Sequence, residues 1–477
     1  MNRRKFIKAS TVATASLTSG PLLWGNSNRW KRANDRINVA VIGIRGQGQS
    51  HITEYSKLKN VEVAAICDID ENLFGPRIKK LFTEKNLREP KTYQDLRKLF
   101  ENKDIDAVSI VTPNHWHALA SIWALQAGKH VSVEKPSCHN FHEGKKLIEA
   151  ARKYKLVVQD GAEQRSNPCA QSAVEFMRKG KLGEVYMAKG VCYKWRDSIG
   201  AYPDGPMLPD EKFALTVGSK NYEPAYTKEY LSKVNYDLWL GPAPMRAFNR
   251  NRFHYNWHWN WDYGNGDMGN QGVHEMDVAR WGLGVKLPSK ISAMGGHVMF
   301  EDAQQTPNTL MAVFEFPNPE GKGDKKKILQ FEVRHWMSNP EGNHLGSSES
   351  AGNTYMTSAE NVVGNIFYGS EGYMLKDVDH WQTYMGRKRE KGESGTGIGN
   401  HYQNFVDAVR ANDPGMLTAP IEEGFYSCAL IHLANISYRL GRTINFDPDK
   451  QTIINDPKAT ALLSREYREP YSMPHQI

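Results

Sequence analysis

Hydrophobic positions in the first third of the chain form short runs that alternate with helical patterns. Five apolar runs rich in β-branched residues are typical of buried parallel strands: residues 37–43, 61–70, 105–113, 129–136 and 156–165. Helical patterns lie between them, at residues 51–58, 93–100, 115–128 and 143–154. This alternation predicts a doubly wound parallel sheet, whose ligands bind beyond the carboxyl ends of the strands.

The pattern changes after residue 165. Most of the later apolar runs read as strands with no helix between them: residues 185–195, 290–300, 308–316, 326–336 and 365–377. A chain of 477 residues is too long for one ordinary core, and it holds no stretch of about 20 consecutive apolar residues. We therefore expect two domains and no membrane span, with an α/β nucleotide-binding domain over residues 36–160 and an α+β domain over residues 161–477.

The N-terminal residues 1–32 are set apart from both domains. They contain the pair Arg3 and Arg4 and a modest apolar segment rich in threonine and serine, which is typical of a twin-arginine export signal. The alternative is a disordered basic N-terminus on a cytosolic protein. The formal net charge falls from +8 to +1 without these residues. The basic composition therefore gives no indication of nucleic-acid binding, and we predict none.

Two polar segments and the cysteines add little. The basic run at 322–327 lies between two predicted strands and is interpreted as a solvated hairpin turn, whereas the glycine-rich segment at 342–361 is interpreted as a long loop, of a kind that often covers an active site. The five cysteines are an odd number without metal-type spacing. An exported protein could form a disulfide, but nothing in the spacing selects partners.

A glycine-rich turn follows the first strand. The dinucleotide-binding fingerprint has glycine at its first, third and sixth positions, and Gly43 and Gly48 occupy the first and sixth. The third position is Arg45, with Gly46 beside it. Asp68 follows the second strand at the distance where an acid contacts the adenosine ribose, which favours NAD over NADP, although Arg45 could pair with a phosphate. Asp68 could also cap a helix.

The strand ends complete the predicted cofactor site at Thr112–Asn114, Glu134–Pro136 and Glu163–Arg165. The residues predicted to contact NAD are Gly43, Ile44, Arg45, Gly46, Gln47, Gly48, Asp68, Thr112, Pro113, Asn114, His117, Glu134, Lys135 and Gln164.

Lys135 and His274 are the candidates for proton transfer. Lys135 ends a buried strand, where loss of contact with water favours the neutral amine and prepares it to exchange a proton with a hydroxyl. The plainer alternative is a surface lysine in a loop. His274 is followed three residues later by Asp277 on the same helical face, which could fix the tautomer of the imidazole. His274 and Asp277 supply only two donors, so we predict no metal site.

Several motifs resemble the Gfo/Idh/MocA oxidoreductases. These are EKP at 134–136, TPNHWH at 112–117 and GAEQRSNP at 161–168, together with the C-terminal segments 401–412, 433–448 and 465–471. The N-terminal arginine pair and WLGPAP at 239–244 resemble the exported branch common in Bacteroidetes-type bacteria. The resemblance implies a nicotinamide-dependent enzyme that acts on sugars or cyclitols. It also implies a second domain with a large, open, mostly antiparallel sheet. One broad face of such a sheet needs cover, so we expect a homo-oligomer, either dimer or tetramer.

The resemblance also implies roles for particular residues. The matching histidine of the family follows an aspartate by four residues, but that position here is Asn270, which cannot ionise; nearby Asp267 could substitute for it or merely cap a helix. The predicted catalytic residues are Lys135, His274, Asn270 and Asp277. The predicted substrate contacts are Lys135, Arg165, Tyr193, Arg196, Asp197, Trp257, His258, Asn270 and His274.

The sequence therefore predicts a periplasmic enzyme with tightly bound NAD that transfers hydride at a hydroxyl, by our prediction C3, of a saccharide or glycoside. One alternative is an NAD-dependent glycoside hydrolase that works by transient oxidation, elimination, hydration and re-reduction. A less favoured alternative is a saccharide-binding protein without catalysis.

Overall fold

The computed structural model describes residues 36–208, 210, 213–214, 222–223, 225–317, 325–335, 361–474 and 476–477. The predicted export signal at 1–32 lies outside these residues. So do residues 322–324 of the predicted turn at 322–327, whose last two residues begin β12, and all but the last residue of the segment at 342–361. None of the described helices is long and apolar enough to cross a membrane.

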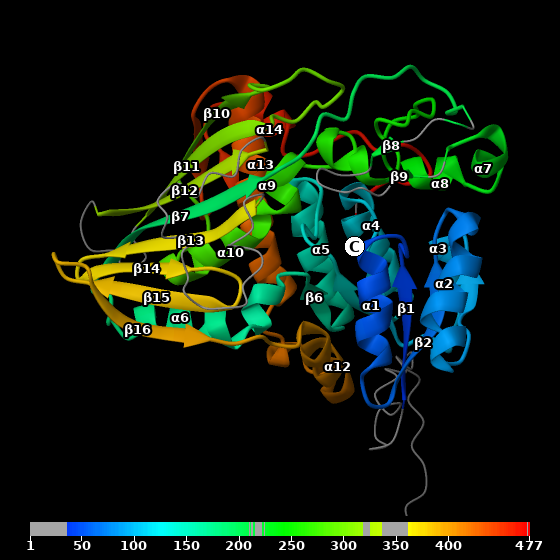
Figure 1. Ribbon diagram of the computed structural model, residues 1–477, viewed down its shortest axis with the longest axis horizontal. Helices are drawn as coiled ribbons and strands as arrows, with labels where there is room; N and C mark the ends of the chain where they lie inside the picture. Colours follow the sequence, from blue (N-terminus) through cyan, green and yellow to red (C-terminus); the bar gives the residue numbers. More distant parts are fainter. Residues whose placement is uncertain are drawn as a thin grey trace, which may run out of the picture. The chain divides into compact units, whose positions relative to one another are not determined.

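The first part of the chain folds into a six-stranded parallel sheet in the order β3-β2-β1-β4-β5-β6 (Figure 1). Its strands are β1 (Ile37–Ile42), β2 (Val61–Cys67), β3 (Lys91–Tyr93), β4 (Ala107–Ile110), β5 (His130–Val133) and β6 (Val158–Asp160). The predicted doubly wound sheet is therefore confirmed. The strand β3 was not predicted, because its three residues are polar and lie at the sheet edge, where no apolar run is needed.

Helices connect these strands on both faces. They are α1 (Gln47–Ser56), α2 (Phe74–Leu81), α3 (Leu96–Glu101), α4 (Asn114–Gln126) and α5 (Phe141–Tyr154). The helix α4 is buried along nearly its whole length, so it lacks an exposed polar stripe. It starts directly after the carboxyl end of β4, which places its first residues at the ligand-binding edge of the sheet.

The second sheet has ten strands in the order β16-β15-β14-β13-β7-β12-β11-β10-β17-β18. Its strands are β7 (Val185–Lys194), β10 (Lys290–Gly296), β11 (Thr309–Pro317), β12 (Lys326–Arg334), β13 (Asn361–Gly369), β14 (Gly372–Lys376), β15 (His380–Met385), β16 (Glu390–Thr396), β17 (Ile444–Asp447) and β18 (Thr452–Ile453). Only the β7–β12 pair is parallel, so the predicted, mostly antiparallel sheet is confirmed.

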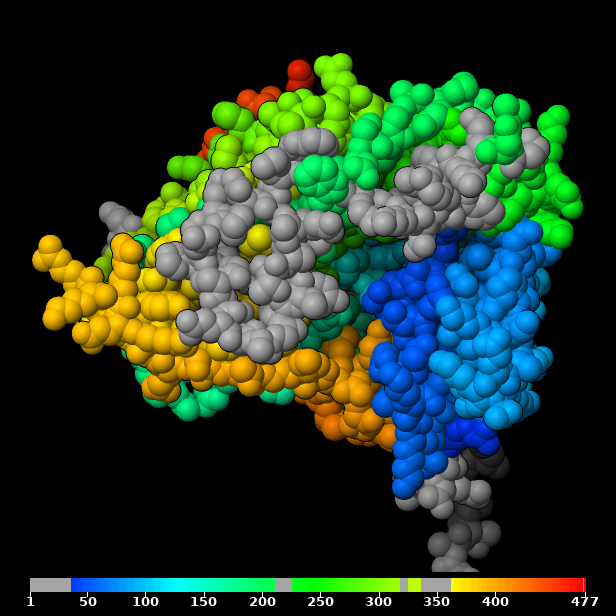
Figure 2. All heavy atoms as spheres, in the orientation of Figure 1, coloured from blue at the N-terminus to red at the C-terminus, as the bar shows by residue number. Residues whose placement is uncertain are grey.

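Helices cover one face of this sheet. The helices α10 (Gly272–Leu283) and α13 (Ile421–Leu440) lie behind the strands in Figure 1, and α6 (Pro168–Arg178) packs beside α10. Phe314, Phe331 and Phe367 point from the strands into the core between the layers. Of the remaining helices, α12 (His401–Ala411) follows β16, and α14 (Pro457–Ala461) lies near the C-terminus. On the side drawn in Figure 2, β13–β16 (yellow to orange) and the blue α1 and α2 lie at the surface.

A segment of irregular structure lies between β7 and β10 in the sequence and contacts the residues that follow β2. We call residues 225–263 the cover segment; it holds the short helices α7 (Lys228–Ser232) and α8 (Tyr236–Leu240) and the 3-10 helix η5 (His254–Trp259). It has its own small core, which includes Tyr226, Trp239, Phe253 and Tyr263. Short strands β8 (Phe213–Ala214) and β9 (Tyr222–Glu223) precede it, and α9 (Gly266–Asn270) leads from it into α10.

Candidate active site

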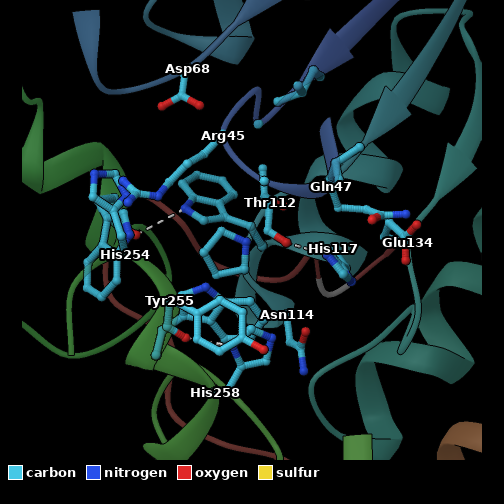
Figure 3. Close-up of a pocket in the computed structure, with 18 of the residues that line it drawn as sticks. Arg45, Gln47, Asp68, Thr112, Asn114, His117, Glu134, His254, Tyr255 and His258 are labelled. Atoms are coloured by element: carbon cyan, nitrogen blue, oxygen red, sulfur yellow. Dashed lines mark hydrogen bonds between the residues drawn. The ribbon is translucent and has the colours of Figure 1, made fainter. Parts of the chain in front are cut away.

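One cavity of about 620 Å³ lies between the carboxyl ends of β1, β2, β4 and β5 and the cover segment. In Figure 3, His254, Tyr255 and His258 of the cover segment face Arg45 and Asn114 across this cavity. Most of the residues predicted to bind cofactor line it: Gly43, Arg45, Gly46, Gln47, Asp68, Thr112, Pro113, Asn114, His117, Glu134 and Lys135.

The glycine turn after β1 has the shape that a dinucleotide pyrophosphate needs. Gly43 has φ +86°, and a Cβ there would lie 2.4 Å from the carbonyl oxygen of Val111. A Cβ on Gly48 would lie 1.9 Å from the Gly43 oxygen, so Gly48 allows α1 to pack on the turn. Gly48 and Ile44 were predicted to contact the cofactor, but neither lines the cavity, because Gly48 packs on the turn and the Ile44 side chain is fully buried.

Asp68 points into the cavity beyond β2. Its Oδ2 accepts the Ile44 N–H at 2.9 Å, and its Oδ1 accepts the Asp70 N–H at 3.0 Å. These bonds fix the carboxylate at the edge where an adenosine ribose is bound in this fold. Burial raises the pKa of Asp68 to about 6, because the charged form loses water.

The affinity for NAD is therefore expected to depend on pH. Hydroxyl donors of the ribose stabilise the ionised carboxylate, so binding favours the state of Asp68 without a proton. NAD affinity should be constant above pH 6 and fall about tenfold per pH unit below it, because a proton must then be released on binding. Titration of the nucleotide-free protein with NAD between pH 5 and 8 tests this dependence. An Asp68→Asn variant should bind NAD weakly at every pH and lose the slope, whereas an unchanged slope would assign the proton to another group.

Two histidines hold the strand ends together. His51 lies 2.9 Å from Oε1 of Glu134, and its other nitrogen lies 2.7 Å from Oγ of Ser109. The imidazole of His117 reaches the carbonyl oxygens of Thr112 and Pro136, at 2.6 and 2.7 Å. His117 therefore ties the loop after β4 to the loop after β5, which positions both edges of the cavity.

Lys135, Asn270 and His274 meet in the same cavity, although they come from the loop after β5, from α9 and from α10. Nζ of Lys135 donates to the backbone oxygen of Asn270 at 2.7 Å. Burial, followed by the nearby charge of Lys135, lowers the pKa of His274 to about 3. His274 is therefore neutral at ordinary pH and can accept a proton.

The amide at position 270 is bound to a buried acid. Nδ2 of Asn270 donates to Oδ1 of Asp267 at 2.9 Å. Arg196 donates to both oxygens of Asp267, and Nε2 of His335 lies 2.7 Å from Oδ2. Burial alone would raise the pKa of Asp267, but the charges of Arg196 and His335 hold it well below its usual range. Asp267 neither caps α9 nor lines the cavity, so it does not replace the missing acid.

Asp277 does not orient His274 as predicted. Its carboxylate accepts two bonds from Nε of Arg165 and one from Nη2, and it accepts a further bond from Ser427 at 2.5 Å. Arg165 also lies 3.0 Å from Glu423 and is 4% exposed. Both residues thus form a buried ion-pair network, and Arg165, a predicted substrate contact, does not line the cavity.

Four other predicted contacts also lie away from the main cavity. The side chain of Tyr193 is on the opposite face of β7, where it donates to Glu332 at 2.8 Å. Asp197 is exposed and accepts a hydrogen bond from Nε1 of Trp195. Arg196 donates its hydrogen bonds to the buried Asp267. Gln164 accepts from Lys376, while its neighbour Glu163 lines the main cavity.

The cover segment supplies residues that the sequence did not identify. Trp257 and His258 line the cavity as expected, but so do Trp239, His254 and Tyr255. For His254 and Tyr255, the available signal was the density of aromatic residues at positions 253–263. Nδ1 of His258 lies 2.6 Å from the Tyr255 carbonyl oxygen. Because a carbonyl only accepts, Nδ1 carries the proton and Nε2 keeps its lone pair.

The cover segment is anchored over the adenosine end of the cavity. Asp70, just beyond β2, accepts from Tyr230 at 2.6 Å and lies 3.1 Å from Nε2 of His254. Backbone bonds join Glu71 to Lys233 and Asn235 to Ile69. A bound dinucleotide would therefore be enclosed between this segment and the parallel sheet.

NAD fits the residues present, since the glycine turn leaves room for a pyrophosphate and Asp68 presents a carboxylate to a ribose. The same test gives no support for a metal ion. Within the part of the chain that the structure describes, no group of three or more histidine, cysteine or acidic side chains could hold a metal ion.

Two family models match most of the chain. Residues 37–162 match the oxidoreductase family, NAD-binding Rossmann fold, of the Gfo/Idh/MocA proteins. Residues 210–313 and 376–473 match the C-terminal alpha/beta domain of the same family.

Curated relatives match a shorter stretch. Glycosyl hydrolase family 109 proteins of Shewanella pealeana and Shewanella putrefaciens are 28% and 30% identical over 171 and 172 residues. Each match covers 32% of this chain and 37% of the relative. The chain therefore spans little more than a third of the length of these relatives.

Solved structures share the fold. A levoglucosan dehydrogenase in complex with NADH and levoglucosan aligns with a TM-score of 0.58 at 16% identity, over 86% of this chain and 99% of that one. The WlbA dehydrogenase from Bordetella pertussis, in complex with NADH and UDP-GlcNAcA, aligns with a TM-score of 0.57 at 16% identity, over 87% and 98%.

Proposed function

Because the chain belongs to the Gfo/Idh/MocA family of oxidoreductases, we propose that it acts on a hydroxyl group of a saccharide or glycoside, with C3 as the reacting carbon. The observation that carries the proposal is the convergence of Lys135 and His274 on the cavity that also holds the glycine turn. NAD, which the glycine turn and Asp68 would hold there, would supply the hydride acceptor for a carbinol carbon.

The residues of this chain supply the proton transfer. His274 is neutral, so it can take the hydroxyl proton as hydride leaves the carbon. Lys135 donates to a backbone oxygen and has two further N–H groups, which can hold the same hydroxyl. Trp257 offers an aromatic face at the cavity edge, and an aromatic ring stacks well on the C–H face of a sugar.

A second function is favoured by a second base in the cavity. Oxidation at C3 acidifies the proton on C2, so the glycosidic substituent can leave by elimination, and water addition with re-reduction gives net hydrolysis. This cycle needs a base for the C2 proton besides the one for the hydroxyl. His258 presents an unprotonated Nε2, and burial lowers its pKa to about 3. The similarity to glycosyl hydrolase family 109 proteins supports this alternative.

We also propose that the protein is exported to the periplasm with NAD already bound, and that it forms a dimer or tetramer there. The paired Arg3 and Arg4 support export. The anchored cover segment supports tight retention of the cofactor. A retained cofactor must be reset within the site, either by a second substrate or by the redox-neutral cycle.

The two functions are separated by incubating the NAD-loaded protein with p-nitrophenyl glycosides of common hexoses and N-acetylhexosamines. Absorbance of the reduced nicotinamide, ketosugar and released nitrophenol are followed together. Ketosugar with one equivalent of reduced cofactor supports the oxidoreductase, whereas repeated nitrophenol release with normal sugar recovered supports the hydrolase. If neither product forms and the nicotinamide absorbance stays constant with every glycoside and free sugar, both proposals are wrong.

A further inference from the structure

A second, smaller cavity of about 200 Å³ adjoins the main one. Glu163, Gln271 and His274 line both cavities, so His274 lies on their common wall. The remaining lining residues come from η4 (Glu163–Ser166), α10, β7, β13, β14 and the turn after β14. They are Gln164, Lys194, Glu275, Val278, Val363, Gly364, Asn365, Lys376, Asp377 and Val378. We call this space the side cavity.

One wall of the side cavity is a chain of polar side chains in fixed positions. Nζ of Lys194 donates to Oε1 of Gln271 at 2.5 Å, and Nε2 of Gln271 donates to Oε1 of Glu275 at 3.0 Å. Nδ2 of Asn365 donates to the backbone oxygen of Glu275 at 2.8 Å. An ammonium group has three donors, so Lys194 has donors left for a ligand.

A second ammonium group lines the side cavity from β14, where Lys376 is the cross-strand partner of Asn365. Nζ of Lys376 donates to Oε1 of Gln164 at 2.9 Å and to the backbone oxygen of Asp377 at 2.6 Å. Neither Lys376 nor Lys194 forms a salt bridge with a carboxylate of the described residues; both are held by neutral oxygens. Val278, Val363 and Val378 add an apolar surface to the lining of the side cavity. Gly364 also lines it and has no side chain that would occupy the cavity.

This combination suits a sugar ring. The side cavity is several times larger than the ~30 Å³ that one water molecule occupies in the liquid, and its lining combines apolar surface with convergent polar groups, as ligand sites generally do. The C–H face of a ring can lie on the valines, while its hydroxyls bond to the lysine and amide groups. Glu163, Glu275 and Asp377 also line the side cavity, but among the described residues they do not form a group that could hold a metal ion.

We propose that the side cavity is a saccharide subsite, which binds the ring next to the one that reacts at Lys135 and His274. The proposal rests on the proposed function for the position of the reacting ring. It defines the substrate class as oligosaccharides, or glycosides with a second sugar unit, rather than free monosaccharides.

The test measures the binding gain from a second ring. The full-length, NAD-loaded protein is titrated by calorimetry with matched pairs of methyl glycosides, each a monosaccharide and its disaccharide: glucoside with maltoside or cellobioside, and N-acetylglucosaminide with chitobioside. In at least one pair the disaccharide is expected to bind at least tenfold more tightly. Lys194→Met should reduce that gain to less than about threefold without changing monosaccharide affinity, because one hydrogen bond from a charged donor is worth about tenfold or more in affinity.

Matched variants make the result specific. Lys189→Met alters the same strand on its opposite face, where Lys189 lies 3.5 Å from Glu332, and should keep the full gain. Lys376→Met repeats the test at the second ammonium group, with thermal unfolding measured for each variant. The subsite is refuted if no pair shows a gain, including when no glycoside binds, or if the gain survives in both Lys194→Met and Lys376→Met.

The same titrations separate this inference from the proposed function. A second-ring gain that is lost in Lys194→Met, with no change in nicotinamide absorbance and no product, would support the subsite and contradict the function. Turnover that is equal for both members of every pair would support the function and contradict the subsite.

Discussion

Lys135→Met is expected to lower kcat by roughly 10²–10⁴-fold, the range for loss of a positioned group that transfers or holds a proton. Methionine keeps most of the side-chain volume but removes the ammonium group that donates to the Asn270 oxygen. The amount of bound NAD should not change, because the glycine turn and Asp68 hold the other end of the cofactor. Turnover is measured with the best glycoside of the panel described above, and NAD content by absorbance after denaturation.

Three further variants separate a chemical role from a packing role. Lys135→Arg keeps the charge but cannot lose a proton, so it should not restore kcat. Lys145→Met, at an exposed position of α5, should retain full activity. His274→Asn should be as damaging as Lys135→Met, and the double variant should lose less than the product of the two effects, since both residues serve one hydroxyl. A Lys135→Met enzyme with normal kcat would assign the chemistry to His274 alone.

The nucleotide edge of the cavity was predictable because its geometry is local. Parallel strands end at the same edge of the sheet, so Thr112, Glu134 and Lys135 were expected to meet there. Gly43 follows from the same reasoning, since only a glycine turns there without meeting the Val111 oxygen. These inferences need only strand positions, which the apolar runs reveal.

The failed predictions concern partners that are far apart in the sequence. His274 and Asp277 are three residues apart on α10, which suggested a pair, but Arg165 from the loop after β6 binds Asp277 instead. Sequence spacing shows which side chains share a helix face, and it does not show which charged group from another element will meet them. The prediction that Tyr193 contacts substrate was wrong because successive residues of a strand point to opposite faces of the sheet. Tyr193 therefore points away from the face that carries Lys194.

The cover segment was unpredictable for a different reason. Residues 254–259 form a 3-10 helix, and short turns of this kind have no useful hydrophobic period. This 3-10 helix is held over the cavity by the contact between His254 and Asp70, and Asp70 follows β2, far away in the sequence. The signal in the sequence was the density of aromatic residues, which indicated a packed element without indicating what it packs on.

The second large effect is expected from Tyr230→Phe combined with His254→Phe. An aromatic ring remains at both positions, but the Asp70 carboxylate loses its bonds to Oη of Tyr230 and Nε2 of His254 and keeps its bonds from Asn72. Burial would then raise the pKa of Asp70, which these bonds now help to hold below its usual value. Since a hydrogen bond to a charged group contributes roughly 1.5–3 kcal/mol, release of NAD should accelerate by about 10²-fold or more.

The readout is NAD retained through gel filtration and the rate at which nicotinamide fluorescence is lost on dilution of the reduced holoenzyme. Tyr236→Phe is the matched control, because its hydroxyl donates to the Ala247 oxygen within the cover segment and does not contact β2. If the double variant unfolds at a lower temperature yet releases NAD at the wild-type rate, the cover segment stabilises the fold without retaining the cofactor. Faster release with an otherwise normal fold would instead show that the anchor at Asp70 retains the cofactor.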